Sequence, residues 1–251
     1  MITPIYPDWN APKNVHALTS TRLGGVSLPP YHSLNLGTHV GDKLEHVLLN
    51  RTRIIQAKHI PAQPQWLNQT HSNNVVNLSH NEIIQSNQKI IHADGAYTQQ
   101  TKQVCVVLTA DCLPVLFCSK NGDEVAAAHA GWRGLYHGIL ENTVQHFQCD
   151  PNDILAWFGP AIGPDRFEVG QEVKDQFEAQ HSDAASAFTL IDPINKKYLA
   201  NIYQLAQQRL NRLGITKISG GEYCTYRQSD LFYSYRREKQ TGRMASIIWF
   251  E

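Results

Sequence analysis

The spacing of hydrophobic residues along the chain predicts short strands and helices that do not alternate strictly. Apolar runs that are continuous or alternate with polar residues indicate strands, and they fall at 15–21, 66–70, 75–76, 104–108, 114–118, 124–128, 155–158 and 245–250. Apolar residues that recur every three or four positions indicate helices, and these are expected at 44–59, 135–147, 172–180 and 201–213.

One pair of these strands is predicted to form a β-hairpin, which bears on the fold class. Lys120-Asn121-Gly122-Asp123 joins the runs at 114–118 and 124–128, and Asn-Gly strongly favours a tight turn between antiparallel strands. An antiparallel hairpin among unevenly mixed elements favours an α+β fold with mixed sheets over a parallel doubly wound fold. No repeat or long linker interrupts the 251 residues, so we expect a single domain over 1–251.

Three segments at the ends of apolar runs carry side chains that bind metal ions. They are Asn68-Gln69-Thr70-His71, Thr109-Ala110-Asp111-Cys112 and His129-Ala130-Gly131-Trp132-Arg133-Gly134. If His71, Cys112 and His129 converge, they would hold a zinc-like ion and leave one coordination position open for chemistry. Taken singly, such a cysteine is more often a core residue and such a histidine a satisfied polar group. Their shared place beside turns favours the metal site.

The same residues allow two other kinds of site. Cys112 paired with His129 or His71 would suit nucleophilic catalysis, in which the histidine lowers the pKa of the thiol. This interpretation ranks second, because no third residue that would orient the histidine is obvious. A closed structural zinc site would instead need a fourth protein ligand, for which His92 and Cys224 are the candidates.

Two acidic residues and one arginine in or near these segments could take part in catalysis or anion binding. Asp111 directly precedes the candidate thiolate, where it could act as a general base or hold a ligand histidine in one tautomer. The strand-to-helix turn at 131–134 offers free N–H groups that, together with Arg133, suit an anion. In Ala93-Asp94-Gly95 we favour a turn role for Asp94 over catalysis.

Charge and cysteine content narrow the expected partners and compartment. Lys plus Arg and Asp plus Glu both number 22, so nothing indicates binding to nucleic acid or to an anionic membrane. The start of the chain lacks a secretion signal, and no segment reaches the ~20 apolar residues of a membrane span. Five cysteines, an odd number, argue against a disulfide framework. We therefore expect a cytoplasmic protein with reduced thiols.

Ordered motifs over nearly the whole chain resemble a widespread bacterial family. It was first described as laccase-like polyphenol oxidases and is now described as purine nucleoside phosphorylases of the laccase-domain type. The motifs are Thr21-Arg22-Leu23-Gly24-Gly25-Val26-Ser27, Ser33-Leu34-Asn35-Leu36-Gly37, His39-Val40-Gly41-Asp42, Gln69-Thr70-His71, Ala93-Asp94-Gly95, Thr109-Ala110-Asp111-Cys112-Leu113-Pro114, His129-Ala130-Gly131-Trp132-Arg133-Gly134, Gly159-Pro160-Ala161-Ile162-Gly163, Tyr223-Cys224-Thr225-Tyr226 and Phe232-Tyr233-Ser234-Tyr235-Arg236-Arg237.

The resemblance implies a fold, a cofactor and a reaction. The fold would be shared with cysteine-hydrolase-like toxin domains: duplicated mixed β-sheets packed as a central sandwich, with helices on the outer faces in four layers (α/β/β/α). The cofactor would be zinc, held by His71, Cys112 and His129. The reaction would be phosphate-dependent cleavage of inosine, guanosine, adenosine and methylthioadenosine, with adenosine deamination in some members. A purine nucleoside and phosphate are then the expected partners.

Motif position also suggests which residues meet the substrate. Arg22, Asn35 and Arg236 are expected to line the pocket, and Arg133 or Arg22 to hold the phosphate with backbone amides. For deamination, Asp111 is the candidate for proton transfer, because the His-x-Glu and Pro-Cys-x-x-Cys elements of ordinary zinc deaminases are missing.

Two further activities remain open from the resemblance. One is an amidase that edits peptidoglycan precursors, which would need no phosphate. The other is the older oxidase description, but none of the 12 histidines stands two residues from another, so the paired His-x-His motifs of a multicopper cluster are missing. A Cys/His site nevertheless binds copper at least as tightly as zinc, so copper-dependent polyphenol oxidation could appear in metal-loaded protein.

Overall fold

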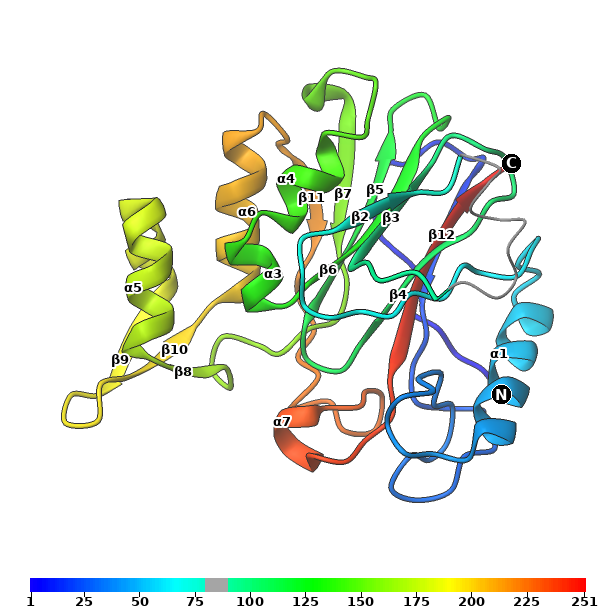
Figure 1. Cartoon of the computed structure of the whole chain (residues 1–251), viewed down its shortest axis with the longest axis horizontal. Coiled ribbons are helices and arrows are strands. Elements are labelled where there is room, and N and C mark those ends of the chain that lie inside the picture. Colours follow the sequence, from blue (N-terminus) through cyan, green and yellow to red (C-terminus); the bar gives the residue numbers. More distant parts are fainter. Residues whose placement is uncertain (80–89) are drawn as a thin grey trace.

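The computed structural model describes residues 1–79 and 90–251 and is centred on a six-stranded sheet (Figure 1). Its strand order is β11-β7-β5-β6-β3-β2. The β2–β3 and β7–β11 pairs are parallel and the other pairs are antiparallel, so the sheet is mixed. The strands span β2 Val75–Asn77, β3 Gly95–Thr98, β5 Leu113–Ser119, β6 Val125–Ala130, β7 Ile154–Phe158 and β11 Lys217–Gly220.

A second, antiparallel sheet packs against one face of the first. It has the order β1-β12-β4 and joins β1 Val15–Thr19, β12 Met244–Phe250 and β4 Cys105–Thr109. Val107 and Ile248 from this sheet meet Leu116, Ala127 and Trp157 from the six-stranded sheet in one buried cluster. Burying a large apolar side chain such as Val107, Leu116 or Ile248 stabilises the folded state by roughly 1.5–3 kcal/mol. The two sheets therefore share a core.

Helices cover the outer faces of the two sheets (Figure 1). Leu140 of α4 and Leu205 of α6 pack with Phe117 on the outer face of the six-stranded sheet. Ile54 of α1 packs with Val106 and Ile247 of the antiparallel sheet. In the described part of the chain the α-helices are α1 Leu44–Ala57, α3 Trp132–Tyr136, α4 Ile139–Val144, α5 Gln171–Gln180, α6 Ile202–Arg212 and α7 Tyr235–Glu238.

A third sheet and α5 extend to one side of the molecule, at the left of Figure 1. The sheet is antiparallel in the order β8-β10-β9, with strands β8 Glu168–Gly170, β10 Lys197–Ala200 and β9 Phe188–Asp192. Two 3₁₀ helices, η1 Pro151–Asp153 and η2 Ser182–Ala187, are also present. Phe167, next to β8, brings this extension to the edge of the candidate site.

The predicted α+β class with mixed sheets is confirmed, and most of the predicted elements are present. The hairpin is β5–β6, with Gly122 at a positive φ of 74°. The duplication, the four-layer description and the single domain over 1–251 stay predictions.

Two predicted elements are wrong. Residues 66–70 form no strand, because only an isolated bridge from Asn68 to His92 pairs there. The helix expected after Gly134 is two short helices that begin at Trp132, before that glycine. Gly138 separates them at a φ of 89°, a left-handed conformation that interrupts the helical path and suits glycine. Among the residues described, no helix is both long and apolar enough to span a bilayer.

Candidate metal centre and substrate pocket

The fold brings together the three predicted metal ligands. One candidate ligand atom from each of His71, Cys112 and His129 lies within 4.8 Å of the other two. In the described part of the chain, no other three or more His, Cys, Asp or Glu side chains form such a group. The β5–β6 ladder pairs Leu113 with Ala130, so Cys112 and His129 lie at the same end of the hairpin. The loop before β2 adds His71.

Asp94 holds His71 and His129 of this group in place through hydrogen bonds. Its fully buried carboxylate accepts hydrogen bonds from the backbone N–H groups of Thr70, His71 and Ser72, at 3.1, 3.0 and 2.7 Å. It also accepts from the Ser72 hydroxyl at 2.7 Å and pairs with Nδ1 of His129 at 2.8 Å. The last contact leaves Nε2 of His129 available as a ligand atom. The sequence around Asp94 predicts only a turn and gives no sign of this role.

Local backbone geometry makes the close approach possible. His71 has a positive φ of 61°, which is uncommon for a residue with a side chain and is fixed here by the contacts to Asp94. At Gly131, an added Cβ would lie 2.9 Å from Sγ of Cys112 and 3.2 Å from Cδ2 of His71. Only glycine therefore leaves the candidate ligands the space they occupy.

Electrostatics favour the metal-binding form of the cysteine. Burial raises the pKa of the Cys112 thiol, but the charges and hydrogen bonds of His129 and His71 outweigh burial and hold it at about 6. Cys112 and Asp94 in turn raise the pKa of His129 against the effect of burial. A thiolate and two imidazoles, one of them oriented by a carboxylate, fit a tetrahedral ion such as zinc and also fit copper.

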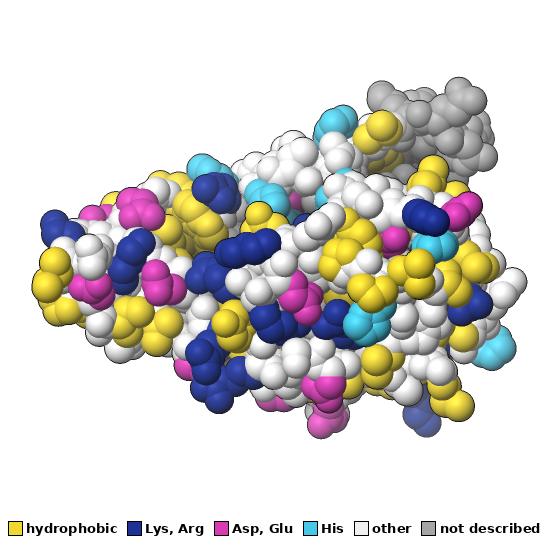
Figure 2. Space-filling model, turned by 90° about the horizontal axis from the view of Figure 1, so that it is seen from below, with side chains coloured by type: hydrophobic (Ala, Val, Ile, Leu, Met, Phe, Trp, Pro, Cys, Tyr) yellow, Lys and Arg dark blue, Asp and Glu magenta, His cyan; other side chains and the backbone are white. Residues whose placement is uncertain are grey.

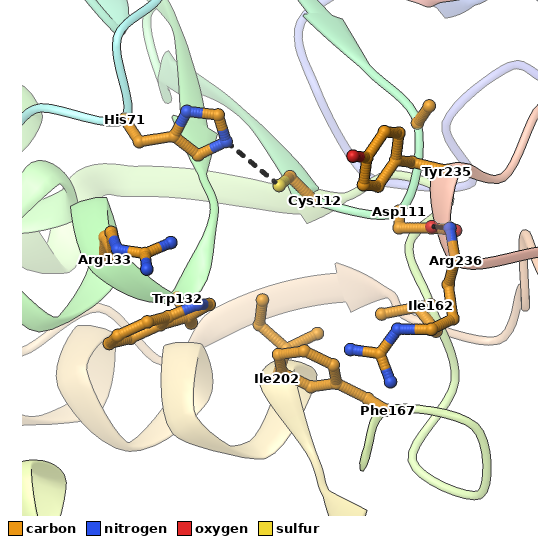
Figure 3. A pocket seen from close by; sticks show the side chains of 11 residues that line it. His71, Asp111, Cys112, Trp132, Arg133, Ile162, Phe167, Ile202, Tyr235 and Arg236 are labelled. Atoms are coloured by element: carbon orange, nitrogen blue, oxygen red, sulfur yellow. Dashed lines mark hydrogen bonds between the residues drawn. The ribbon is translucent and has the colours of Figure 1, made fainter. Parts of the chain in front are cut away.

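A pocket of about 260 Å³ opens beside the group, and we call it the apolar lobe (Figure 3). Figure 3 shows His71 and Cys112 on one side, with Ile202 and Phe167 across from them. The lobe is lined by His71, Ala110, Asp111, Cys112, Trp132, Arg133, Ile162, Phe167, Ile202, Tyr235 and Arg236. Flat aromatic and aliphatic walls with a few polar groups are typical of small-molecule sites.

A second pocket of about 410 Å³ meets the first at the candidate ligands, and we call it the polar lobe. The two lobes share four residues: His71, Ala110, Cys112 and Tyr235. The polar lobe adds His39, Gln69, Leu108, Thr109, His129 and Arg243. The sequence predicts no site role for His39 or Arg243. His39 occurs in the motif His39-Val40-Gly41-Asp42, but neither residue stands in a local pattern typical of metal or anion binding.

Asp111 lies in the apolar lobe but does not orient a ligand histidine. Its Oδ1 accepts from the Thr225 hydroxyl at 2.6 Å, and its Oδ2 accepts from the N–H of Arg236 at 2.7 Å. The orienting role proposed for Asp111 therefore belongs to Asp94. The positive φ of Asp111, 91°, turns the chain immediately before Cys112.

Two of the four predicted substrate-binding residues line the pocket. Arg133 lies over the Trp132 ring at 4.4 Å, and Arg236 donates to the carbonyl of Glu168 at 3.0 Å. The other two line neither lobe. Arg22 pairs with Glu238 at 2.9 Å, and buried Asn35 accepts from the N–H of Arg243 at 2.9 Å, supporting the polar lobe from behind.

The two candidates for a fourth ligand lie outside the group. His92 Nδ1 is 2.9 Å from Nδ2 of Asn68, and Sγ of Cys224 accepts from the N–H of Gly163 at 3.2 Å. Within residues 1–79 and 90–251, the group thus has three candidate protein ligands. This favours an open site over a closed structural one.

The fold and site define a mixed α/β protein with an open His–Cys–His centre between two pocket lobes. The chain belongs to the family described as multi-copper polyphenol oxidoreductase laccase, whose model matches residues 16–251. It is 55% identical to a purine nucleoside phosphorylase of Haemophilus influenzae, over 98% of this chain and 99% of the relative. It is 53% identical to purine nucleoside phosphorylase YfiH of Escherichia coli, over 98% of both chains.

A solved structure agrees with this assignment. A Neisseria meningitidis protein with 47% identity matches 99% of both chains with a TM-score of 0.92. That identity and coverage extend the likeness from the sequence to the whole described fold.

Proposed function

We propose that this chain is a zinc-dependent purine nucleoside phosphorylase. Inosine, guanosine, adenosine or methylthioadenosine would react with phosphate to give the free base and ribose 1-phosphate, or its methylthio analogue. The observation that carries the proposal is the naming of relatives 55% and 53% identical over 98% of the chain as purine nucleoside phosphorylases. We place the reaction in the cytoplasm, in keeping with five free cysteines.

The site offers a role to each group of residues. Zinc, when bound, would supply a fixed positive charge and a Lewis acid at the junction of the lobes. His71, Cys112 and His129 would hold it, and Asp94 would keep His129 in one tautomer. The aromatic walls of the apolar lobe suit a planar purine, with Arg133 and Arg236 as polar contacts to the nucleoside. Orientation and electrostatic positioning would supply most of the rate gain.

The experiment that tests this proposal follows hypoxanthine and ribose 1-phosphate from inosine. Zinc-loaded protein should release both products only when phosphate is present, and chelator-treated protein should release neither. Release of free ribose without phosphate would point to a hydrolase, and no release by zinc-loaded protein would contradict the proposal.

Adenosine deamination is the finer part of the proposal. Asp111 lines the apolar lobe and would transfer the proton, although both of its oxygens already accept a hydrogen bond. Adenosine should then yield ammonia and inosine, and Asp111→Asn should lower ammonia release more than phosphorolysis of inosine. Equal losses of both would assign Asp111 a structural role.

An amidase is the second candidate, and the geometry around His129 favours it. Asp94 supplies the orienting carboxylate that the sequence did not reveal, so Cys112, His129 and Asp94 resemble a Cys–His–Asp arrangement for attack on an acyl carbon. The predicted likeness to cysteine-hydrolase-like toxin domains would accord with this chemistry. Cleavage of peptidoglycan-type amides that survives chelation and needs no phosphate would support it over the phosphorylase.

The identity of the metal belongs to the same proposal. We expect zinc in protein purified without added metal, measured by elemental analysis. Copper in place of zinc at the same three ligands would account for polyphenol oxidation by metal-loaded protein. Oxidation by the zinc form would contradict this account.

A further inference from the structure

The polar lobe has the composition of an anion site. Besides the four residues that it shares with the apolar lobe, its polar lining comprises His39, Gln69, Thr109, His129 and Arg243, and no Asp or Glu lines it. On the face that Figure 2 shows, Lys and Arg side chains gather around the middle, with a few Asp and Glu side chains among them. A recess that is lined by a guanidinium and by imidazoles, and that lacks carboxylates, suits an anion.

Arg243 is fixed in the lobe without an acidic partner. One nitrogen of its guanidinium, Nη1, donates to the carbonyls of Thr241 and Gly242 at 3.1 and 3.0 Å. Its other nitrogens find no hydrogen-bond acceptor among the described residues, and no carboxylate there forms an ion pair with it. A half-buried charge without a partner is costly, and the missing partner would be an anion.

Residues around Arg243 add further positive charge and hydrogen-bonding groups near the polar lobe. The guanidinium of Arg51 lies 3.8 Å from the Trp66 ring and donates to the carbonyl of Leu36, again with no carboxylate partner in the described residues. Burial, followed by the charges of Arg243 and Arg51, lowers the pKa of His39. The Thr109 hydroxyl is buried and has no partner in residues 1–79 and 90–251. Arg243, which lines the lobe, and Arg51 behind it thus have no carboxylate partner, and the Thr109 hydroxyl has no hydrogen-bond partner, among the described residues.

We propose that the polar lobe is the phosphate subsite and that Arg243 holds the phosphate dianion, with His39 beside it. The inference rests on the proposed function and departs from the expectation that Arg133 or Arg22 holds phosphate. Arg133 stacks on Trp132 in the apolar lobe, and Arg22 is paired with Glu238. A guanidinium fork matches the oxygens of phosphate.

The subsite places both substrates at the shared junction. With the nucleoside in the apolar lobe, a phosphate oxygen reaches the sugar C1′ beside Cys112 and Tyr235, which belong to both lobes. The C1′–O bond to phosphate forms as the C1′–N9 bond breaks. The electron pair of that bond goes to the base nitrogen, and the proton carried by hydrogen phosphate ends on the base.

The test compares Arg243→Gln with three other variants in zinc-loaded protein. Binding of inorganic phosphate is measured by calorimetry, and the KM values for phosphate and inosine are measured separately. R243Q should weaken phosphate binding and raise the KM for phosphate about 10- to 100-fold, with a much smaller change in the KM for inosine. Arg243→Lys, which keeps the charge but lacks the fork, should fall between wild type and R243Q.

Two controls separate this role from general effects of charge. Arg133→Gln removes an arginine of the apolar lobe and should raise the KM for inosine more than that for phosphate. Arg53→Gln removes an exposed charge on α1 and should change neither constant. Zinc content and thermal unfolding confirm that each variant folds.

The possible results bear on the subsite and on the phosphorylase proposal separately. Phosphate binding by R243Q equal to that of wild type, or equal rises in both KM values, would overturn the subsite. Binding that depends on Arg243 supports it. If wild type binds phosphate through Arg243 yet does not cleave nucleosides with it, the subsite stands and the phosphorylase proposal fails.

Discussion

Asp94 accepts five hydrogen bonds, and together they fix two of the three candidate ligands. Four come from the loop that carries His71, and the fifth comes from Nδ1 of His129. Burial raises the pKa of the Asp94 carboxyl, but the contacts with His129 and Ser72 outweigh burial and bring it down to about 2. The carboxylate is therefore charged at neutral pH, and the five donors around it stabilise that charge.

Asp94→Asn tests this positioning role. The amide would present N–H groups to the backbone donors of residues 70–72, and the ring of His129 would lose its charged partner. Zinc affinity, measured by competition with a chromogenic chelator, should fall about 10- to 100-fold while the fold persists. Ser72→Ala removes only the hydroxyl contact and should have a smaller effect. Wild-type affinity in the Asn variant would contradict the role.

Residue types identified the candidate ligands, but not the residues that support them. His71, Cys112 and His129 stand out because metal-binding side chains recur at strand ends. Asp94 and Arg243 act through partners far away in the sequence: Asp94 is 35 residues from His129, and the N–H of Arg243 bonds to Asn35 across 208 residues. No local spacing encodes such contacts.

At the scale of elements, the junction between β6 and α3 leaves no room for a side chain at Gly131 beside the candidate ligands. β6 ends at Ala130, Gly131 is the N-cap, and α3 begins at Trp132. Strong apolar periodicity predicted β5, β6 and α6, whereas the third sheet escaped prediction because β9 is largely exposed. The strand expected at 66–70 does not form for a different reason. Apart from the single bridge from Asn68 to His92, these residues have no neighbouring strand to pair with.

Gly131→Ala tests the junction. The new methyl group would press on Sγ of Cys112 and on the His71 ring, so we expect loss of zinc binding and of turnover without global unfolding. Zinc stoichiometry and far-UV circular dichroism measure the two effects. Gly170→Ala is the matched control, because the three atoms nearest to its new methyl group all belong to the flexible side chain of Glu172. A G131A protein that binds zinc normally would show that the ligands can shift.

At the scale of the whole molecule, segments near the two ends of the chain are joined. β1 and β12 pair from Val15–Phe250 to Thr19–Ser246, and Arg22 forms an ion pair with Glu238 of α7 at 2.9 Å. Glu238 also accepts from Arg237 and Thr241. This network lies next to Tyr235 and Arg236, which line the apolar lobe. The contacts that join the two ends of the chain therefore also support the wall of the pocket.

The network predicts a pH dependence of stability. Burial raises the pKa of Glu238, but hydrogen bonds from Thr241, Arg22 and Arg237 lower it below its usual value of 4.5 overall. Because the folded state favours the carboxylate, its contribution is complete above the unfolded pKa and is lost as pH falls through the folded pKa. In urea unfolding, Glu238→Gln should be less stable than wild type at pH 7, and the difference should shrink below about pH 4.5.

Exposed Glu222→Gln is the control for this prediction and should leave the pH profile unchanged. A constant difference between wild type and E238Q from pH 7 to pH 4 would mean that the charge of Glu238 does not stabilise the fold.

We propose above all that one metal ion, held by His71, Cys112 and His129, serves a phosphate-dependent cleavage of purine nucleosides. The most direct measurement is hypoxanthine release from inosine and phosphate as zinc is added back to metal-free protein, for wild type and Cys112→Ala. We expect wild-type turnover to rise until about one zinc is bound per chain, while a folded C112A protein stays inactive. Full turnover by metal-free protein, or by C112A, would contradict it.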